Sequence, residues 1–138
     1  MIIGIGTDLC DIRRIEKTIE KFGDRFLNRV FTKAERAYCD AKSGRASYYA
    51  KRFAAKEAAA KALSGARTGH LTWKDVEVQN DPSGRPVIYL YCGAKERLES
   101  LTPHGMNAHI QLSLSDDYPY AQAFVITEAF APQRILEV

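Results

Sequence analysis

The sequence lacks a long hydrophobic run and an export signal and has little cysteine, and each absence excludes a class of protein. Its longest apolar stretches span a few residues, such as 58–60, far short of the ~20 residues of a membrane-spanning helix. The first eight residues, MIIGIGTD, carry no basic segment, and an acidic residue arrives too early for a secretory signal. Cys10, Cys39 and Cys92 are odd in number and have no Cys-x-x-Cys spacing, which predicts reduced thiols in a cytoplasmic protein.

The remaining composition is that of an ordinary globular domain. Of the 138 residues, 46% are hydrophobic and 27% charged, with nine Gly and five Pro, which excludes disordered and collagen-like chains. A chain of this length buries about 70% of the surface that its unfolded state exposes. We therefore expect one domain over residues 1–128, followed by a tail over 129–138.

Charge is distributed unevenly between the two halves. Residues 1–67 carry 15 basic and 8 acidic side chains, whereas residues 68–138 carry 5 and 9. A basic half attracts an anionic partner, which could be nucleic acid, a membrane surface, a nucleotide-like substrate or an acidic protein. A well-solvated helical half would also explain the asymmetry, so charge alone does not decide between these partners and a solvated surface.

Periodicity divides the chain into a mostly helical first half and a mostly stranded second half. Apolar residues at helical spacing predict an amphipathic helix over 11–22 that ends at Gly23. The capping box from Thr32 to Glu35 opens a short helix, and the segment 45–64, free of Gly and Pro, predicts the longest helix. The alanines at 54, 58 and 62 favour close packing of this helix against a sheet.

The strands are predicted from alternation and turn residues. The isoleucines after Met1 predict a strand that ends near Asp8, and residues 76–79 and 87–92 form a hairpin around the turn 80–86. In that hairpin we expect Val76 and Val78 to point inward and Glu77 outward. A short helix before Pro103 and two last strands, 110–115 and 120–127, complete the series. The order indicates an α+β domain with a mainly antiparallel sheet.

Two charged features could carry chemistry. Asp8 follows a Gly-x-Gly-Thr stretch at a strand end, where a carboxylate can reach a hard cation, although acids at such ends are commonly helix caps or solvated. Glu57 and Lys61 lie one helical turn apart, which by itself indicates a surface pair that contributes only ~0.2–0.5 kcal/mol. Phe53 on the same face favours partial burial, where the carboxylate could bind a divalent ion and the lysine could neutralise phosphate.

The helix over 11–22 has segregated charges, which favours an acidic macromolecular partner over a solvated face. Its acids, Glu16 and Glu20, lie on the other side of the apolar stripe from its bases. No aromatic residues are interleaved with these bases, which argues against single-stranded nucleic acid. The basic residues that we expect to contact a partner are Arg13, Arg14, Lys17, Lys21 and Arg25.

With these motifs in this order, the chain resembles the holo-acyl-carrier-protein synthases, which are small phosphopantetheinyl transferases. The resemblance runs from Gly4 to about Glu128. The motifs that carry it are GIGTDL at 4–9, RFAAKEAAAKA at 52–62, F-T-x-x-E at 31–35, N-D-x-x-G-R-P at 80–86 and Y-A-x-A at 120–123. It implies an antiparallel sheet wrapped around one long central helix.

The resemblance also implies an activity: transfer of the phosphopantetheine arm of coenzyme A to a serine of apo acyl carrier protein, for fatty acid biosynthesis. It implies that Asp8 and Glu57 hold Mg²⁺ and that Lys61 lies beside the pyrophosphate. Glu57, directly or through water, would take the serine proton. Lys61, Ser64, Gly65 and Asp116 are the implied contacts to coenzyme A.

The implied partner is acidic acyl carrier protein, with Arg14 and Arg25 as the leading docking residues, and neither nucleic acid nor a membrane is expected. A homotrimer with active sites between subunits is also implied. Two departures bear on nucleotide binding: Ser64-Gly65-Ala66 replaces Gly-Thr-Gly, and Asp116 stands where many relatives have histidine.

Two other functions compete with this one. A non-catalytic basic module could bind an acidic protein or nucleic acid without Mg²⁺ or coenzyme A. A Mg²⁺-dependent nucleotide hydrolase or phosphotransferase would keep Asp8 and Glu57 but use ATP or water in place of the carrier serine.

Overall fold

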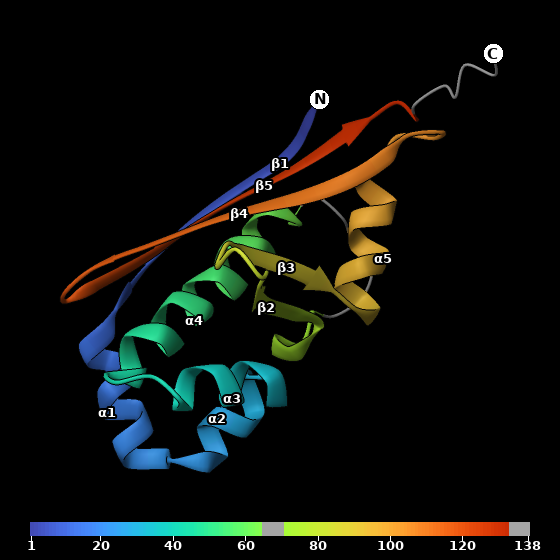
Figure 1. The fold of residues 1–138 in the computed structure, drawn as a ribbon. Coiled ribbons are helices and arrows are strands. Elements are labelled where there is room, and N and C mark those ends of the chain that lie inside the picture. The colour runs from blue at the N-terminus through green and yellow to red at the C-terminus, as the bar shows by residue number, and fades with distance from the viewer. Residues whose placement is uncertain (65–70, 133–138) are drawn as a thin grey trace.

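The computed structural model describes residues 1–64 and 71–132. Within them, a three-stranded sheet and a two-stranded hairpin surround one long helix, and four shorter helices lie at the ends (Figure 1). The elements are β1 (Ile2–Asp11), α1 (Ile12–Phe22), α2 (Asp24–Val30), α3 (Lys33–Asp40), α4 (Arg45–Ala62), the short 3-10 helix η1 (Trp73–Asp75), β2 (Val76–Asn80), β3 (Pro86–Leu90), α5 (Cys92–Leu101), β4 (Asn107–Asp117) and β5 (Tyr120–Phe130).

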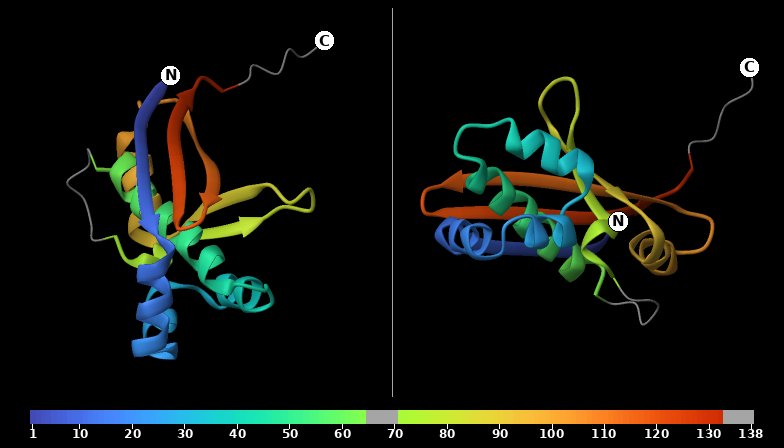
Figure 2. Two further views of the ribbon diagram at one scale, coloured as in Figure 1. Left: turned by 90° about the vertical axis from the view of Figure 1, so that its left-hand side faces the viewer. Right: turned by 90° about the horizontal axis from the view of Figure 1, so that it is seen from below.

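The main sheet has the order β1-β5-β4, and all its pairings are antiparallel. Its inner face rests on α4, while the hairpin β2–β3 flanks the same helix from another side (Figure 2). This arrangement confirms the predicted α+β fold with an antiparallel sheet around a long helix. Its buried side chains come mainly from α4, β5 and α1–α3.

The contact between β1 and α4 is exceptionally close. A Cβ atom added to Gly4 would lie 2.1 Å from the carbonyl oxygen of Ala62, and one added to Gly6 would lie 1.9 Å from that of Ala58. Since real side chains do not tolerate such distances, only glycine fits at these two strand positions. Ala54, Ala58 and Ala62 of α4 are buried, which confirms the prediction that they pack against the sheet.

The helices before α4 follow the sequence with one exception. Asp11 caps α1, and Thr32 and Glu35 form the predicted capping box of α3. The prediction had no helix between Gly23 and Phe31, whereas α2 forms there. Gly23, with φ of 55°, ends α1, yet its carbonyl accepts the bond from Leu27 that begins α2. A glycine that stops one helix can therefore start the next.

The hairpin β2–β3 also corrects one prediction. Val76 and Val78 point inward as expected, but Glu77 is buried rather than outward-facing. Its carboxylate accepts hydrogen bonds from the side chains of Gln79 and of Tyr91, which precedes α5. Burial raises the pKa of Glu77, but hydrogen bonds from the side chains of Thr32, Gln79 and Tyr91 hold it below the usual range.

The ends of several elements differ modestly from their predicted bounds. β1 continues to Asp11, α4 ends at Ala62 rather than Ser64, and β5 runs to Phe130. The extra length of β5 is fixed by pairing, because the amide of Ala129 donates to the carbonyl of Met1 at 2.8 Å.

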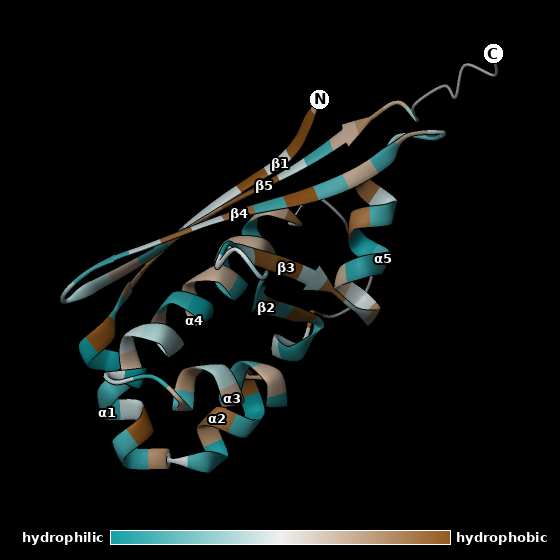
Figure 3. Ribbon diagram, in the orientation of Figure 1, coloured by the Kyte–Doolittle hydropathy of each residue, from teal (hydrophilic) through white to brown (hydrophobic). Residues whose placement is uncertain are grey.

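None of the helices within the described residues has the length and hydropathy of a membrane span. Hydrophilic and hydrophobic bands alternate along α1, as its amphipathic pattern requires (Figure 3).

Replacement of Gly6 by alanine tests the close approach of β1 and α4. The added methyl group would collide with the backbone of Ala58, which cannot rotate away, so we expect a loss of about 3 kcal/mol or more in unfolding free energy. Urea unfolding followed by circular dichroism measures it. Gly44→Ala is the control: its methyl group meets nothing within 4 Å, and its left-handed φ of 66° costs about 1–2 kcal/mol. Equal losses in the two variants would contradict the packing argument.

Candidate active site

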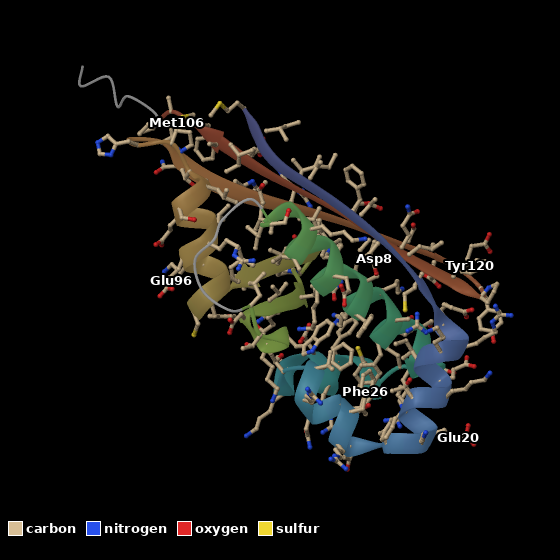
Figure 4. The ribbon with its side chains drawn as sticks, turned by 180° about the vertical axis from the view of Figure 1, so that it is seen from behind. Asp8, Glu20, Phe26, Glu96, Met106 and Tyr120 are labelled. Carbon is tan, nitrogen blue, oxygen red and sulfur yellow. The ribbon has the colours of Figure 1, made fainter. Side chains whose placement is uncertain are left out.

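The candidate site is formed where β1 crosses α4. Residues alternate in direction along a strand, and Gly6 and Cys10 face the core, so Asp8 between them also faces α4. Figure 4 shows Asp8 between β1 and the helix. The absence of side chains at Gly4 and Gly6 brings the strand close enough for Asp8 to reach groups on α4.

Lys61 links the helix to the strand. Its ammonium donates to the backbone carbonyl of Thr7 at 2.9 Å and to the carboxylate of Asp8 at 3.1 Å. The side chain of Lys61 is 56% exposed and that of Asp8 20%, so the pair is open to solvent on one side. Lys61 therefore reaches across to β1, which the surface-pair interpretation of Glu57 and Lys61 did not anticipate.

Glu57 is the third charged group at this crossing. Burial raises the pKa of its carboxyl above the usual range, the nearby carboxylate of Asp8 raises it further, and Lys61 partly offsets both. Two carboxylates close enough to repel one another present a site that a cation would stabilise. The structure thus brings together Asp8, Glu57 and Lys61, the three residues that the family resemblance singles out.

These donors fit a magnesium ion. Mg²⁺ requires only one or two protein carboxylates and completes its octahedron with phosphate oxygens and water. Within residues 1–64 and 71–132, no cluster of three or more His, Cys, Asp or Glu could form an all-protein metal cage. Asp8 and Glu57 therefore provide the kind of incomplete carboxylate set that a metal shared with a phosphate ligand uses.

A small pocket opens beside Glu57. It has a volume of about 120 Å³ and lies between α4 and the segment that leads into β2. The ring of Trp73 stacks on Phe53 with centroids 5.1 Å apart, which fixes one wall. Phe53 shares a helix face with Glu57, as its spacing predicts, but no local pattern indicates a role for Trp73, because the two rings meet only through tertiary packing. The lining residues are Lys56, Glu57, Ala60, Leu71, Thr72, Trp73 and Val76.

The predicted coenzyme A contacts are only partly assembled around this centre. Ser64 is exposed just beyond α4, and its amide donates to the carbonyl of Lys61 at 3.2 Å. Gly65 lies outside the described residues. Asp116 is on the inner face of β4, where its carboxylate pairs with Lys51 at 3.0 Å. Lys51 is six residues before Glu57, or about 9 Å along the helix, so Asp116 lies apart from the carboxylates of Asp8 and Glu57.

The basic surface predicted on the first helix is present. All five of its basic residues are exposed. Arg13 makes two hydrogen bonds to the carboxylate of Asp11, at 2.9 and 2.7 Å, which lower the pKa of Asp11. Glu16 and Glu20 line the same surface hollow, of about 550 Å³, as Arg14, so the acidic sector borders the basic one more closely than the sequence suggested.

Known proteins are similar to the chain in sequence. The family model of the 4'-phosphopantetheinyl transferase superfamily matches residues 4–123. The chain is 61% identical over 130 residues to the holo-[acyl-carrier-protein] synthase of Phenylobacterium zucineum, covering 94% of each protein.

Solved structures share the fold. The crystal structure of holo-[acyl-carrier-protein] synthase from Neisseria meningitidis matches with a TM-score of 0.79 and 34% identity, covering 93% of this chain and 99% of that one. The Helicobacter pylori enzyme in complex with coenzyme A matches with a TM-score of 0.74 and 31% identity, covering 90% and 99%.

Proposed function

The chain belongs to the 4'-phosphopantetheinyl transferase superfamily, and we propose that it transfers the 4'-phosphopantetheine arm of coenzyme A to a serine of apo acyl carrier protein. The products are holo acyl carrier protein, for fatty acid biosynthesis, and adenosine 3',5'-bisphosphate. The observation that carries this conclusion is the convergence of Asp8, Glu57 and Lys61 where β1 crosses α4. Three free cysteines, two of them buried, suit action in the cytoplasm.

We propose that Asp8 and Glu57 hold Mg²⁺. When bound, the ion would neutralise charge on the pyrophosphate of coenzyme A. The support is the chemistry of the donors: two carboxylates from different elements, with the pKa of Glu57 raised by burial and by Asp8.

The chain's own residues have separate tasks in the transfer. The serine oxygen forms a bond to the β-phosphorus while the bond from that phosphorus to the bridging oxygen breaks. Glu57 takes the serine proton, directly or through water. Lys61, held by Thr7 and Asp8, offsets negative charge on the departing bisphosphate. We assign Ser64, Gly65 and Asp116 to the nucleotide side of coenzyme A.

Mass spectrometry of the carrier tests the transfer. The protein is incubated with apo acyl carrier protein, coenzyme A and Mg²⁺, and we expect a gain of about 340 Da on the carrier that a chelator prevents. A carrier that binds tightly but gains no mass would instead support the non-catalytic basic module. Consumption of ATP, or release of phosphate without a modified carrier, would support the hydrolase or phosphotransferase.

Removal of either carboxylate that we propose to hold Mg²⁺ should abolish the mass gain of the carrier protein. We expect Asp8→Ala and Glu57→Ala to lower kcat by at least about 10²–10³-fold, because each removes a group that acts on the reacting phosphate. Circular dichroism should show both variants folded. Glu96→Gln, an exposed carboxylate of α5 remote from the site (Figure 4), is the matched control and should retain full activity. Full activity of Glu57→Ala would refute the assigned mechanism.

We propose that the basic surface of α1 and the start of α2 docks the acidic carrier protein. Arg14 and Arg25 are its leading contacts, with Arg13, Lys17 and Lys21 beside them. All of these side chains are exposed, and Arg14 and Lys17 line the hollow on α1. Opposite charge across such a surface accelerates encounter and fixes orientation.

Removal of one docking charge should affect binding of the carrier more than chemistry. We expect Arg14→Ala to raise the KM for the carrier several-fold, to weaken the salt dependence of kcat/KM, and to leave kcat nearly unchanged. Steady-state kinetics at two ionic strengths measures both effects. Lys95→Ala removes an exposed lysine from α5 and serves as the control. An equal change in the KM of both variants would mean that the net charge of the protein, and not a docking surface on α1, determines binding of the carrier.

We further propose a homotrimer with active sites between subunits. The face of the main sheet turned away from α4 is unusually apolar for a surface: Ile5 is 59% exposed, Leu9 63% and Phe124 39%. These residues lie on adjacent strands, since Ile5 pairs with Ile126 and Thr7 with Phe124. A contiguous apolar face of this kind is typically covered by another protein surface, here a second copy of the chain.

A charge on this face should prevent assembly. We expect Leu9→Lys to sediment with the 15.5 kDa mass of one chain, while the unmodified protein sediments with the mass of three. Phe22→Lys, which changes another exposed apolar residue, at the end of α1, should leave the assembly intact. An unmodified protein that is active and sediments as a single chain would refute the trimer.

A further inference from the structure

Lys56 precedes Glu57 in α4 and is a buried cation whose donors all have partners within the protein. Its side chain is 1% exposed and that of its partner Glu35 is fully buried. The ammonium donates to the carboxylate of Glu35 at 2.8 Å, to the carbonyl of Trp73 at 2.9 Å and to the carbonyl of Val76. All three of its hydrogen atoms are therefore used within the protein.

Glu35 extends this connection to two further segments. One of its oxygens accepts from the amide of Thr32 at 2.9 Å, which completes the capping box of α3. The other accepts from the amide of Val78 at 3.1 Å, in the middle of β2. One buried ion pair thus joins α3, α4, η1 and β2 through directional bonds.

A buried ion pair is a poor source of stability, because desolvation of the charges offsets most of their attraction. Apolar side chains of similar size would hold these segments together equally well. What the pair adds is direction, since each bond requires its acceptor at one distance and angle. The carbonyls of Trp73 and Val76 are held at fixed positions relative to α4.

These two residues are walls of the pocket beside Glu57. Lys56, Trp73 and Val76 all line it, and Trp73 is held from its other side by the stack on Phe53. The backbone bonds to Lys56 therefore set the separation between this wall and the helical turn that carries Glu57.

We propose that Lys56 is a positioning residue for the transfer: through Glu35 and the carbonyls of Trp73 and Val76, it fixes the wall opposite Glu57. The inference rests on the proposed function, because that function makes Glu57 the reacting group that the wall must face. Lys56 itself is enclosed and does not touch the reacting atoms.

The test uses Lys56→Met, which keeps the length and apolar stem of the side chain and removes the ammonium. A misplacement of about 1 Å near reacting groups can cost about 10²-fold in rate, so we expect kcat to fall between about 10- and 100-fold. The KM for the carrier protein should stay the same, because the docking surface on α1 is remote from the ion pair of Lys56 and Glu35.

Trp73 provides a readout that does not depend on activity, because it is the only tryptophan in the chain. We expect Lys56→Met to shift its fluorescence emission to longer wavelength and to increase its quenching by acrylamide, as the wall loosens. Lys74→Met is the matched control: it makes the same change at an exposed lysine next to Trp73 and should alter neither kcat nor quenching.

Each outcome decides the proposal. Loss of kcat together with greater quenching of Trp73 supports it. Unchanged kcat, or unchanged quenching, in a folded Lys56→Met overturns it. If that variant does not fold, Glu35→Gln keeps one acceptor oxygen, for the amide of either Thr32 or Val78, and removes the charge that orients Lys56, and the same two readouts apply. If the unmodified protein transfers nothing, the proposed function fails, while the quenching comparison still decides whether Lys56 fixes the wall.

Discussion

The structure depends on the close approach of β1 to α4. Gly4 and Gly6 leave no space between the strand and the carbonyls of Ala62 and Ala58. Because the helix cannot shift along or away from the strand without losing this contact, the positions of all side chains near the crossing are coupled. A site formed by side chains of a strand and a helix needs the two elements to be fixed relative to one another.

The charged centre follows directly from that contact. Lys61 can bridge to Thr7 and Asp8 only because the two backbones are close, and the same proximity lets Asp8 raise the pKa of Glu57. The repulsion between the carboxylates is tolerated because packing elsewhere stabilises the crossing. The fold therefore holds negative charges together in a place where a cation and a pyrophosphate would relieve the cost.

The other side of α4 is held by a different kind of interaction. Glu35 and Lys56 replace close backbone packing with directional bonds to η1 and β2. The helix is thus fixed against the sheet by the absence of side chains and against the hairpin by a buried ion pair. Glu57 lies between the two, which explains why one helix can present a carboxylate accurately to groups from both sides.

Local patterns predicted much of this architecture. The apolar spacing in 11–22, the capping box at Thr32 and the alternation in the last two strands each involve interactions within a few residues, and all three are present in the structure. The prediction failed where local signals were ambiguous. Gly23 both ends and begins a helix, and the outward position expected for Glu77 is covered by Tyr91, a residue 14 positions away.

The sequence by itself determined most of the helices and strands, the candidate residues Asp8, Glu57 and Lys61, and the family resemblance, because these depend on residue type and short-range spacing. Only the tertiary structure decided that Lys61 pairs with Asp8, that Asp116 pairs with Lys51, and that Lys56 joins Glu35 to the backbone of Trp73. The physical reason is the same in each case. These partners lie between 17 and 65 residues apart in the sequence, and no periodicity within one element records which distant groups will meet when the elements pack.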